Sequence, residues 1–128
     1  MALRDQLRVM VVDDMSTSRG LISQALEGFG LQQIQTADDG ADALNQLQSK
    51  KVHLILSDYN MPGMDGLELL ATLRKNPETQ KLGFILITGS ANQALVERGR
   101  SLGMNNYLAK PFTPSDLKNC LEAVVGRL

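Results

Sequence analysis

The sequence has one cysteine, no excess of either charge and no long apolar run, and each absence excludes a class of protein. A single thiol, Cys120, cannot build an internal disulfide framework, and it fits a reducing compartment. Thirteen Lys and Arg against fourteen Asp and Glu give a net charge of −1, without the basic excess that nucleic-acid binding normally shows. The apolar runs are far shorter than the roughly 20 residues that cross a bilayer, and the opening MALRDQLR lacks the apolar core of a secretory signal. We therefore expect a soluble cytoplasmic protein that binds no nucleic acid and does not insert into membranes.

The chain is long enough to fold around a core of its own. It has 128 residues, of which 43% are hydrophobic. No low-complexity segment or long linker interrupts it. We expect one domain over residues 1–128, acting as a monomer without an appended output domain.

Short apolar runs alternate with helical patterns along the whole chain. The runs rich in β-branched residues occupy residues 8–13, 34–37, 52–57, 84–88 and 106–109. Parallel strands need crossover connections, so this alternation predicts a parallel sheet with helices on both faces. The run at 34–37 is the more polar one and is expected at an edge. The fold class is therefore α/β, a doubly wound, flavodoxin-like five-stranded sheet in the order 2-1-3-4-5 with five helices.

The helix boundaries carry specific signals. Ser16 or Thr17 is expected to cap the first helix, whose apolar stripe comprises Leu21, Ile22, Ala25, Leu26 and Phe29. The segment Thr113-Pro114-Ser115-Asp116 combines an N-cap, Pro at the first helical position and an acid three residues after the cap. This signal predicts the start of the last helix at Pro114.

Polar and charged residues follow the ends of four predicted strands. Asp13 and Asp14 end the first strand, Asp58 follows the third, Thr88 ends the fourth and Lys110 follows the fifth. Open α/β sheets bind ligands beyond the carboxyl ends of their strands, so these side chains should meet in one crevice.

Three carboxylates in one crevice need a cation. Each raises the ionisation cost of the others, and Lys110 alone leaves two negative charges uncompensated. Mg²⁺, which takes oxygen ligands and retains waters, is the simplest solution. A metal, a lysine and a hydroxyl around a carboxylate are the parts of a phosphoryl-transfer site.

Four segments together resemble one family. VVDDMSTSR, LSDYNMPGMDGLELL, ILITGS and NYLAKPFT are similar to the matching segments of two-component response-regulator receiver domains, and most of all to the single-domain chemotaxis branch of that family. The resemblance covers essentially the whole chain.

The resemblance implies a role for each acid. Asp58 would be the phosphoacceptor, taking a phosphoryl group from a phosphohistidine. Mg²⁺ would be bound by Asp14, Asp58 and the backbone carbonyl of Asn60, with Asp13 acting through a metal-bound water. The Asn60 side chain would also flank the phosphoryl group and tune the attacking water.

The resemblance also implies a switch. Lys110 would pair with Asp58 and then with the phosphoryl oxygens, and the Lys110-Pro111 peptide bond would be cis. Thr88 would turn inward to the phosphoryl group, and Tyr107 would follow it. Ser90 stands where the best-known members carry Glu, which affects the lifetime of the phosphate and any assistance by a phosphatase.

The implied protein is a phosphoacceptor that promotes its own phosphorylation and dephosphorylation rather than an enzyme with turnover. Its partners would be a CheA-type sensor histidine kinase and the flagellar motor switch protein FliM, bound through the surface formed by residues 91–103, 106–109 and 113–128. A phosphorelay intermediate or phosphate sink without motor binding is the alternative.

Simpler interpretations exist for the same residues. A double Asp after a strand often caps a helix, and this is the interpretation that we adopt for Asp38-Asp39, which has no Lys or Thr partner. His53 is expected to be structural.

Two other functions fit the sequence less well. A phosphatase of the haloacid dehalogenase group usually has a second acid two residues after its nucleophile, where this chain has Asn60. A flavodoxin-type carrier needs a phosphate-binding loop where this chain has two acids.

Overall fold

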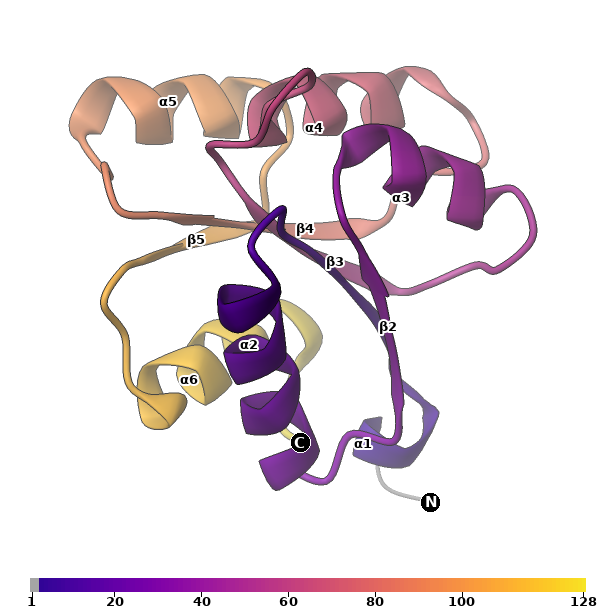
Figure 1. The fold of residues 1–128 in the computed structure, drawn as a ribbon, viewed down its shortest axis with the longest axis vertical. Helices are drawn as coiled ribbons and strands as arrows, with labels where there is room; N and C mark the ends of the chain where they lie inside the picture. Colours follow the sequence, from indigo (N-terminus) through magenta and orange to yellow (C-terminus); the bar gives the residue numbers. More distant parts are fainter. Residues whose placement is uncertain (1–2) are drawn as a thin grey trace.

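The computed structural model describes residues 3–128, which form a three-layer α/β sandwich (Figure 1). Its strands are β1 (Arg8–Val12), β2 (Gln33–Ala37), β3 (Leu54–Asp58), β4 (Gly83–Thr88) and β5 (Asn106–Ala109). Its helices are α1 (Leu3–Gln6), α2 (Ser16–Gly28), α3 (Gly40–Leu47), α4 (Gly66–Lys75), α5 (Gln93–Ser101) and α6 (Pro114–Val125). Among these residues no helix combines the length and hydrophobicity that a membrane crossing requires.

The strands form one parallel sheet in the order β2-β1-β3-β4-β5, as the alternation of runs predicts. The helix count differs from the prediction: the single turn α1 precedes β1, so there are six helices in the described part of the chain rather than five. This turn has four residues and buries none of them, so it carries no apolar stripe from which it could be predicted.

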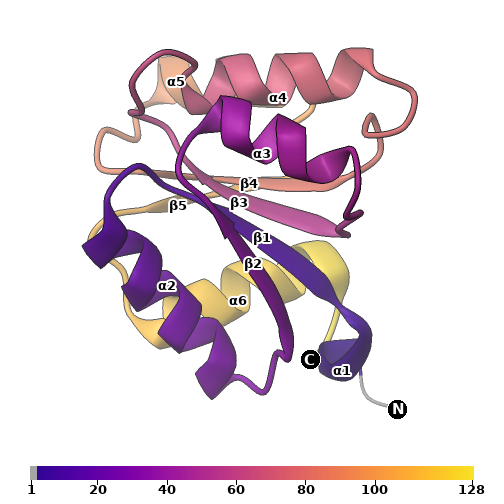
Figure 2. The same cartoon turned by 45° about the vertical axis from the view of Figure 1, so that its right-hand side comes forward.

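Helices cover both faces of the sheet. Helices α3, α4 and α5 lie on one face, and α2 and α6 lie on the other (Figures 1 and 2). Every residue of β3 is buried, whereas in β2 at the edge only Ala37 is buried and the four residues before it are exposed or half-buried. The two cores are therefore separated by the central strands, as expected for a parallel sheet covered on both sides.

Most helix boundaries follow the predicted chemistry. Thr113 and Asp116 form a reciprocal capping box at the start of α6, with Pro114 at the first helical position. Helix α2 differs, because Met15 is its N-cap and provides no side-chain cap bond, so the predicted cap at Ser16 or Thr17 is wrong. The N–H of Met15 is bonded instead by the Asp13 carboxylate, with Met15 N to Asp13 Oδ1 at 2.9 Å.

One predicted core residue is exposed. Ile22 and Leu26 of α2 are buried, but the side chain of Leu21 is 64% exposed. Leu21 lines a shallow apolar groove between α2 and the segment that follows β5, together with Met15, Ala25 and Phe112. The helix packs against the sheet through one face only, and Leu21 lies on the flank of that face.

Two glycines shape the loop between β3 and α4. Gly63 has a φ of +75°, a conformation that side chains disfavour. At Gly66, the first residue of α4, a Cβ atom would lie 2.5 Å from the backbone oxygen of Asp58. Only glycine lets the start of α4 approach the end of β3 this closely, and this contact fixes the path of the loop that carries Asn60.

Candidate functional site

The parallel register brings the predicted strand-end residues to one edge of the sheet. Val12 pairs with Ser57, Asp58 with Ile87, and Thr88 with Ala109. The residues that follow these positions therefore lie beside one another along the carboxyl edge.

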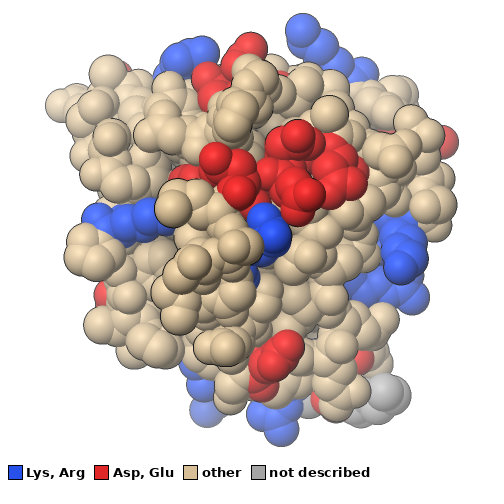
Figure 3. Space-filling model, in the orientation of Figure 1, with Lys and Arg blue, Asp and Glu red and all other residues tan. Residues whose placement is uncertain are grey.

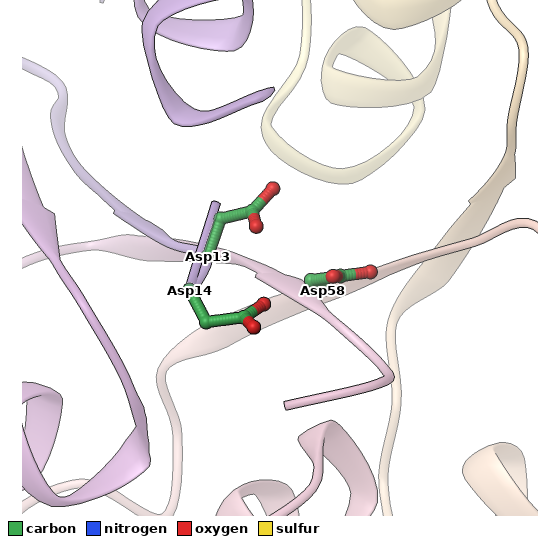
Figure 4. A group of neighbouring side chains, drawn as sticks. All are labelled: Asp13, Asp14 and Asp58. Atoms are coloured by element: carbon green, nitrogen blue, oxygen red, sulfur yellow. The ribbon is translucent and has the colours of Figure 1, made fainter. Parts of the chain in front are cut away.

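Three carboxylates converge there. One oxygen from each of Asp13, Asp14 and Asp58 lies within 4.8 Å of the other two. Figure 4 shows the three side chains projecting to the same side from neighbouring strand ends. Asp13 is fully buried, Asp58 is 9% exposed and Asp14 is exposed. The sequence predicted this grouping, and the structure brings all three acids together.

Asp13 is held by its backbone and by one of its two carboxylate oxygens. Its N–H donates to the carbonyl oxygen of Ala37 (3.1 Å), and its Oδ1 accepts from the N–H of Met15 (2.9 Å). Its Oδ2 is buried and has no hydrogen-bond partner. A buried carboxylate oxygen without a partner is costly, and a cation or its bound water in the acidic cluster would satisfy it.

Asp58 is paired with the predicted lysine. Its Oδ1 accepts from the Lys110 ammonium (3.3 Å) and from the N–H of Tyr59 (2.9 Å). Burial raises the pKa of the Asp58 carboxyl above its usual range, Lys110 counteracts part of this rise, and repulsion from Asp13 adds to it. The Lys110-Pro111 peptide bond is cis, as predicted.

The charge of this edge is unbalanced. Acidic side chains gather in the middle of one face of the molecule, with basic atoms directly beside them (Figure 3). In the acidic cluster, three carboxylates face the single ammonium of Lys110. A hard divalent cation with oxygen ligands fits this donor set, and the unpartnered oxygen of Asp13 independently indicates the same need.

The remaining predicted site residues lie along β4 and β5 and in the loops that follow β3 and β4. Thr88 is 1% exposed, and its Oγ1 accepts from the N–H of Ser90 (3.0 Å). Ser90 is exposed, as is Asn60 after β3. Tyr107 is half-buried on β5 and packs against the core under α3, α4 and α5. The structure thus places a hydroxyl on the strand next to Asp58 and an aromatic ring on the strand beyond.

The second acidic pair behaves as predicted in part. Asp39 caps α3, with its Oδ1 accepting from the N–H of Asp42 (2.8 Å). Asp38 has a partner that sequence reasoning missed, because its Oδ1 lies 3.4 Å from Nη1 of Arg19. Nη1 of Arg19 also donates to the carbonyl oxygen of Asp13 (2.7 Å). The sequence did contain one hint of this contact: Arg19 is a basic residue that follows the acidic pair Asp13-Asp14 within the first turns of α2.

His53 lies just before β3, at the amino ends of the strands and thus at the opposite end of the sheet from the acidic cluster. Its Nδ1 accepts from the backbone N–H of Arg8 (3.0 Å), which agrees with the structural role expected for it.

Comparison with known proteins identifies the family. Residues 9–122 match the family model described as the response regulator receiver domain. The chain belongs to this family. It is similar to a probable chemotaxis protein CheY of Rhizobium etli, at 44% identity over 100% of this chain and 99% of the relative. It is also similar to chemotaxis protein CheY-3 of Vibrio cholerae, at 35% identity over 98% of this chain and 97% of the relative.

Solved receiver structures share the fold. The crystallised chemotaxis protein CheY4 of Vibrio cholerae superposes with a TM-score of 0.87, at 30% identity over 92% of this chain and 98% of that one. The receiver domain of a sensor histidine kinase from Pseudomonas aeruginosa superposes with a TM-score of 0.83, at 26% identity over 94% of this chain and 98% of that one. That structure holds a magnesium ion in its active-site cleft.

Receiver domains bind Mg²⁺ in an acidic pocket, and membership of the family implies a histidine kinase as phosphodonor and a downstream target. The carboxylates of this receiver domain lie where such a pocket is expected, at the carboxyl edge of the sheet.

Proposed function

We propose that this receiver domain is a chemotaxis-type response regulator in which Mg²⁺-dependent phosphorylation of Asp58 controls binding to the flagellar motor switch protein FliM. The observation that carries the proposal is the pairing of Asp58 with Lys110 at 3.3 Å inside a cluster of three carboxylates. The similarity of the chain to chemotaxis proteins over nearly its whole length supports the chemotaxis output.

Asp58 is the nucleophile in this proposal. One carboxylate oxygen attacks the phosphorus of a phosphohistidine on a CheA-type kinase, the P–N bond breaks, and the imidazole leaves with its electron pair and takes up a proton. Asp14, Asp58 and the backbone carbonyl of Asn60 would hold Mg²⁺ directly, and Asp13 would act on it through a water. When bound, the metal neutralises charge on the transferring group.

Lys110 and Thr88 respond to the new phosphoryl group. The ammonium of Lys110, now within reach of Asp58, gains a stronger anionic partner, because a phosphoryl group carries about −1.5 to −2 charges. The hydroxyl of Thr88 already accepts from the N–H of Ser90, so its own hydrogen remains available to donate to a phosphoryl oxygen. Asn60 and Ser90, both exposed, tune access of the attacking water.

Tyr107 links this change to the output surface, formed by α5, β5 and α6. The ring is half-buried and borders a cavity lined by Ala91, Val96 and Arg100 on the side of α5. When Thr88 moves toward the phosphoryl group, it leaves space that the ring of Tyr107 can enter. We call this buried arrangement of Tyr107 the inward state. A ligand shifts such an equilibrium only through different affinities for its two states, so FliM must prefer the inward state.

The direct test measures binding of a labelled N-terminal FliM peptide by fluorescence anisotropy. We expect Mg²⁺ plus a beryllofluoride mimic of the phosphoryl group to increase affinity about 5- to 20-fold. The Asp58→Asn variant is the matched control and should show no gain.

A phosphorelay intermediate or phosphate sink is the second candidate. Ser90 bears on it, because this position, where the best-known members carry Glu, affects the lifetime of the phosphate and any assistance by a phosphatase. Phosphorylation of Asp58 by the kinase without any change in peptide affinity would support this alternative. Absence of phosphorylation would refute both candidates.

A further inference from the structure

Arg19 connects the acidic cluster to the rest of the fold. It lies in the first turns of α2, with its side chain 21% exposed. Its Nη1 donates to the backbone carbonyl oxygen of Asp13 at 2.7 Å and lies 3.4 Å from Oδ1 of Asp38. One guanidinium thus joins the loop after β1 to the loop after β2.

The bond to Asp13 is the stronger of the two contacts. A short hydrogen bond from a charged donor is about twice as strong as a neutral one. The Asp38 side chain is 76% exposed, and exposed ion pairs contribute little. The backbone of Asp38 is held in place, since its N–H donates to Oδ2 of Asp42 (3.0 Å), but its exposed carboxylate adds little to the restraint on Arg19.

The contact with Arg19 completes the restraint on Asp13. The peptide N–H on one side of Asp13 is bonded to Ala37 and the peptide carbonyl on the other side is bonded to Arg19. The carboxylate is fixed through Oδ1 by the N–H of Met15. Only Oδ2 is left, and it is the buried oxygen without a partner.

We propose that Arg19 is a positioning residue: it fixes the peptide that carries Asp13 and holds the Asp13-Asp14 turn in the geometry that a small divalent cation requires. The inference rests on the proposed magnesium site. Mg²⁺ demands near-ideal octahedral geometry, whereas the larger Ca²⁺ tolerates variable geometry. A loosened turn should therefore reduce binding of Mg²⁺ more than binding of Ca²⁺.

A role through charge alone predicts the opposite effect. Arg19 places a positive charge near the site of a cation, so on electrostatic grounds its removal should strengthen metal binding. Positioning predicts weaker binding, so the sign of the change separates the two accounts.

The experiment titrates chelator-treated protein with Mg²⁺ and with Ca²⁺ by isothermal calorimetry. For Arg19→Ala we expect affinity for Mg²⁺ to fall about 10-fold, at the lower end of the losses seen when the groups that orient metal ligands are removed. Affinity for Ca²⁺ should fall less. Arg8→Ala is the matched control, because it removes the same charge at the other end of β1, where Arg8 bonds Gln33. It should leave both affinities unchanged.

Arg19→Lys covers the case in which Arg19→Ala does not fold. It keeps the charge but replaces the planar fork by a shorter-reaching ammonium. Positioning predicts a loss of several-fold in Mg²⁺ affinity, and a charge role predicts none. Unchanged or tighter Mg²⁺ binding in Arg19→Ala, or parent affinity in Arg19→Lys, overturns the inference. If the parent protein itself binds no Mg²⁺, the proposed function fails instead, and with it the basis of this inference.

Discussion

The acidic cluster should lower the stability of the metal-free protein, and replacing Asp13 by Asn tests this. The substitution keeps the shape of the side chain and removes one buried negative charge. The amide oxygen of the introduced asparagine can still accept from the N–H of Met15, so the local turn is retained.

The size of the effect follows from the distances. Two unit charges at 4.8 Å repel by about 3.5 kcal/mol at an effective dielectric constant of 20 and by about 0.9 kcal/mol in bulk water. Lys110 offsets part of the charge of Asp58, and Asp14 is exposed. We therefore expect Asp13→Asn to raise the free energy of unfolding of the metal-free protein by about 1 to 2 kcal/mol, or about 4 to 8 °C in melting temperature.

Mg²⁺ should reverse the order of stability. A ligand that binds only the folded state at 100 times its dissociation constant stabilises it by about 2.7 kcal/mol. The parent protein gains this fully, whereas the variant, which lacks one carboxylate of the cluster, gains less. Thermal melts followed by circular dichroism, in EDTA and in saturating Mg²⁺, measure both differences. Glu78→Gln, an exposed acid in the loop after α4, is the control and should change neither melt.

The pH dependence has a defined sign. The pKa of Asp58 lies above its ordinary value of 3.8, chiefly because the carboxyl is buried. A raised native pKa adds stability that is fully present below the unfolded value and is lost as pH rises through the native value. Acidification should therefore narrow the gap between Asp13→Asn and the metal-free parent. Equal stabilities at neutral pH in EDTA, or equal gains on adding Mg²⁺, would refute the repulsion account.

Three further outcomes test other parts of the site. At limiting Mg²⁺, Asp14→Ala should weaken metal binding more than Asp13→Ala, because Asp14 is proposed to bind directly; equal losses by calorimetry contradict that assignment. Thr88→Ala should leave phosphorylation of Asp58 measurable with labelled phosphodonor but reduce the gain in FliM-peptide affinity about 5-fold or more, and an undiminished gain argues against coupling through the hydroxyl. Burial raises the pKa of the Cys120 thiol to about 11, so the folded protein should react with iodoacetamide at pH 8 about 100-fold more slowly than the unfolded chain; comparable rates would show that the thiol is not protected.

The strand ends could be predicted from the sequence because they depend on few assumptions. Continuous apolar runs indicate buried parallel strands, and in a parallel sheet all carboxyl ends share one edge. The grouping of Asp13, Asp14, Asp58 and Lys110 follows from these two statements. The capping box of Thr113 and Asp116 was predictable for a similar reason, since all its contacts lie within four residues.

The features that the sequence did not predict depend on how α2 is rotated and tilted against the sheet. A periodic stripe defines the buried face only approximately, so it includes Leu21, whose side chain is exposed at the margin of that face. The contact of Arg19 with the Asp13 carbonyl and with Asp38 needs the actual distance between two loops. The use of Asp13 in place of Ser16 at the start of α2 is a competition between local acceptors, and sequence alone does not decide such a competition.

The order of the strands places the proposed switch on one side of the sheet and leaves the other side out of it. Asp58 ends the middle strand, and only β4 and β5 separate it from one edge of the sheet. In the proposed switch, Thr88 and Tyr107 lie on those two strands, so the change at Asp58 reaches the output surface through β4 and then β5. The other side of the sheet, formed by the edge strand β2 and by α3, takes no part in this change. Substitutions there act on the site only through the contacts that hold Asp13, which come from Ala37 and, through Arg19, from Asp38, whereas β4 and β5 must preserve both the fold and the coupling between Asp58 and the output surface.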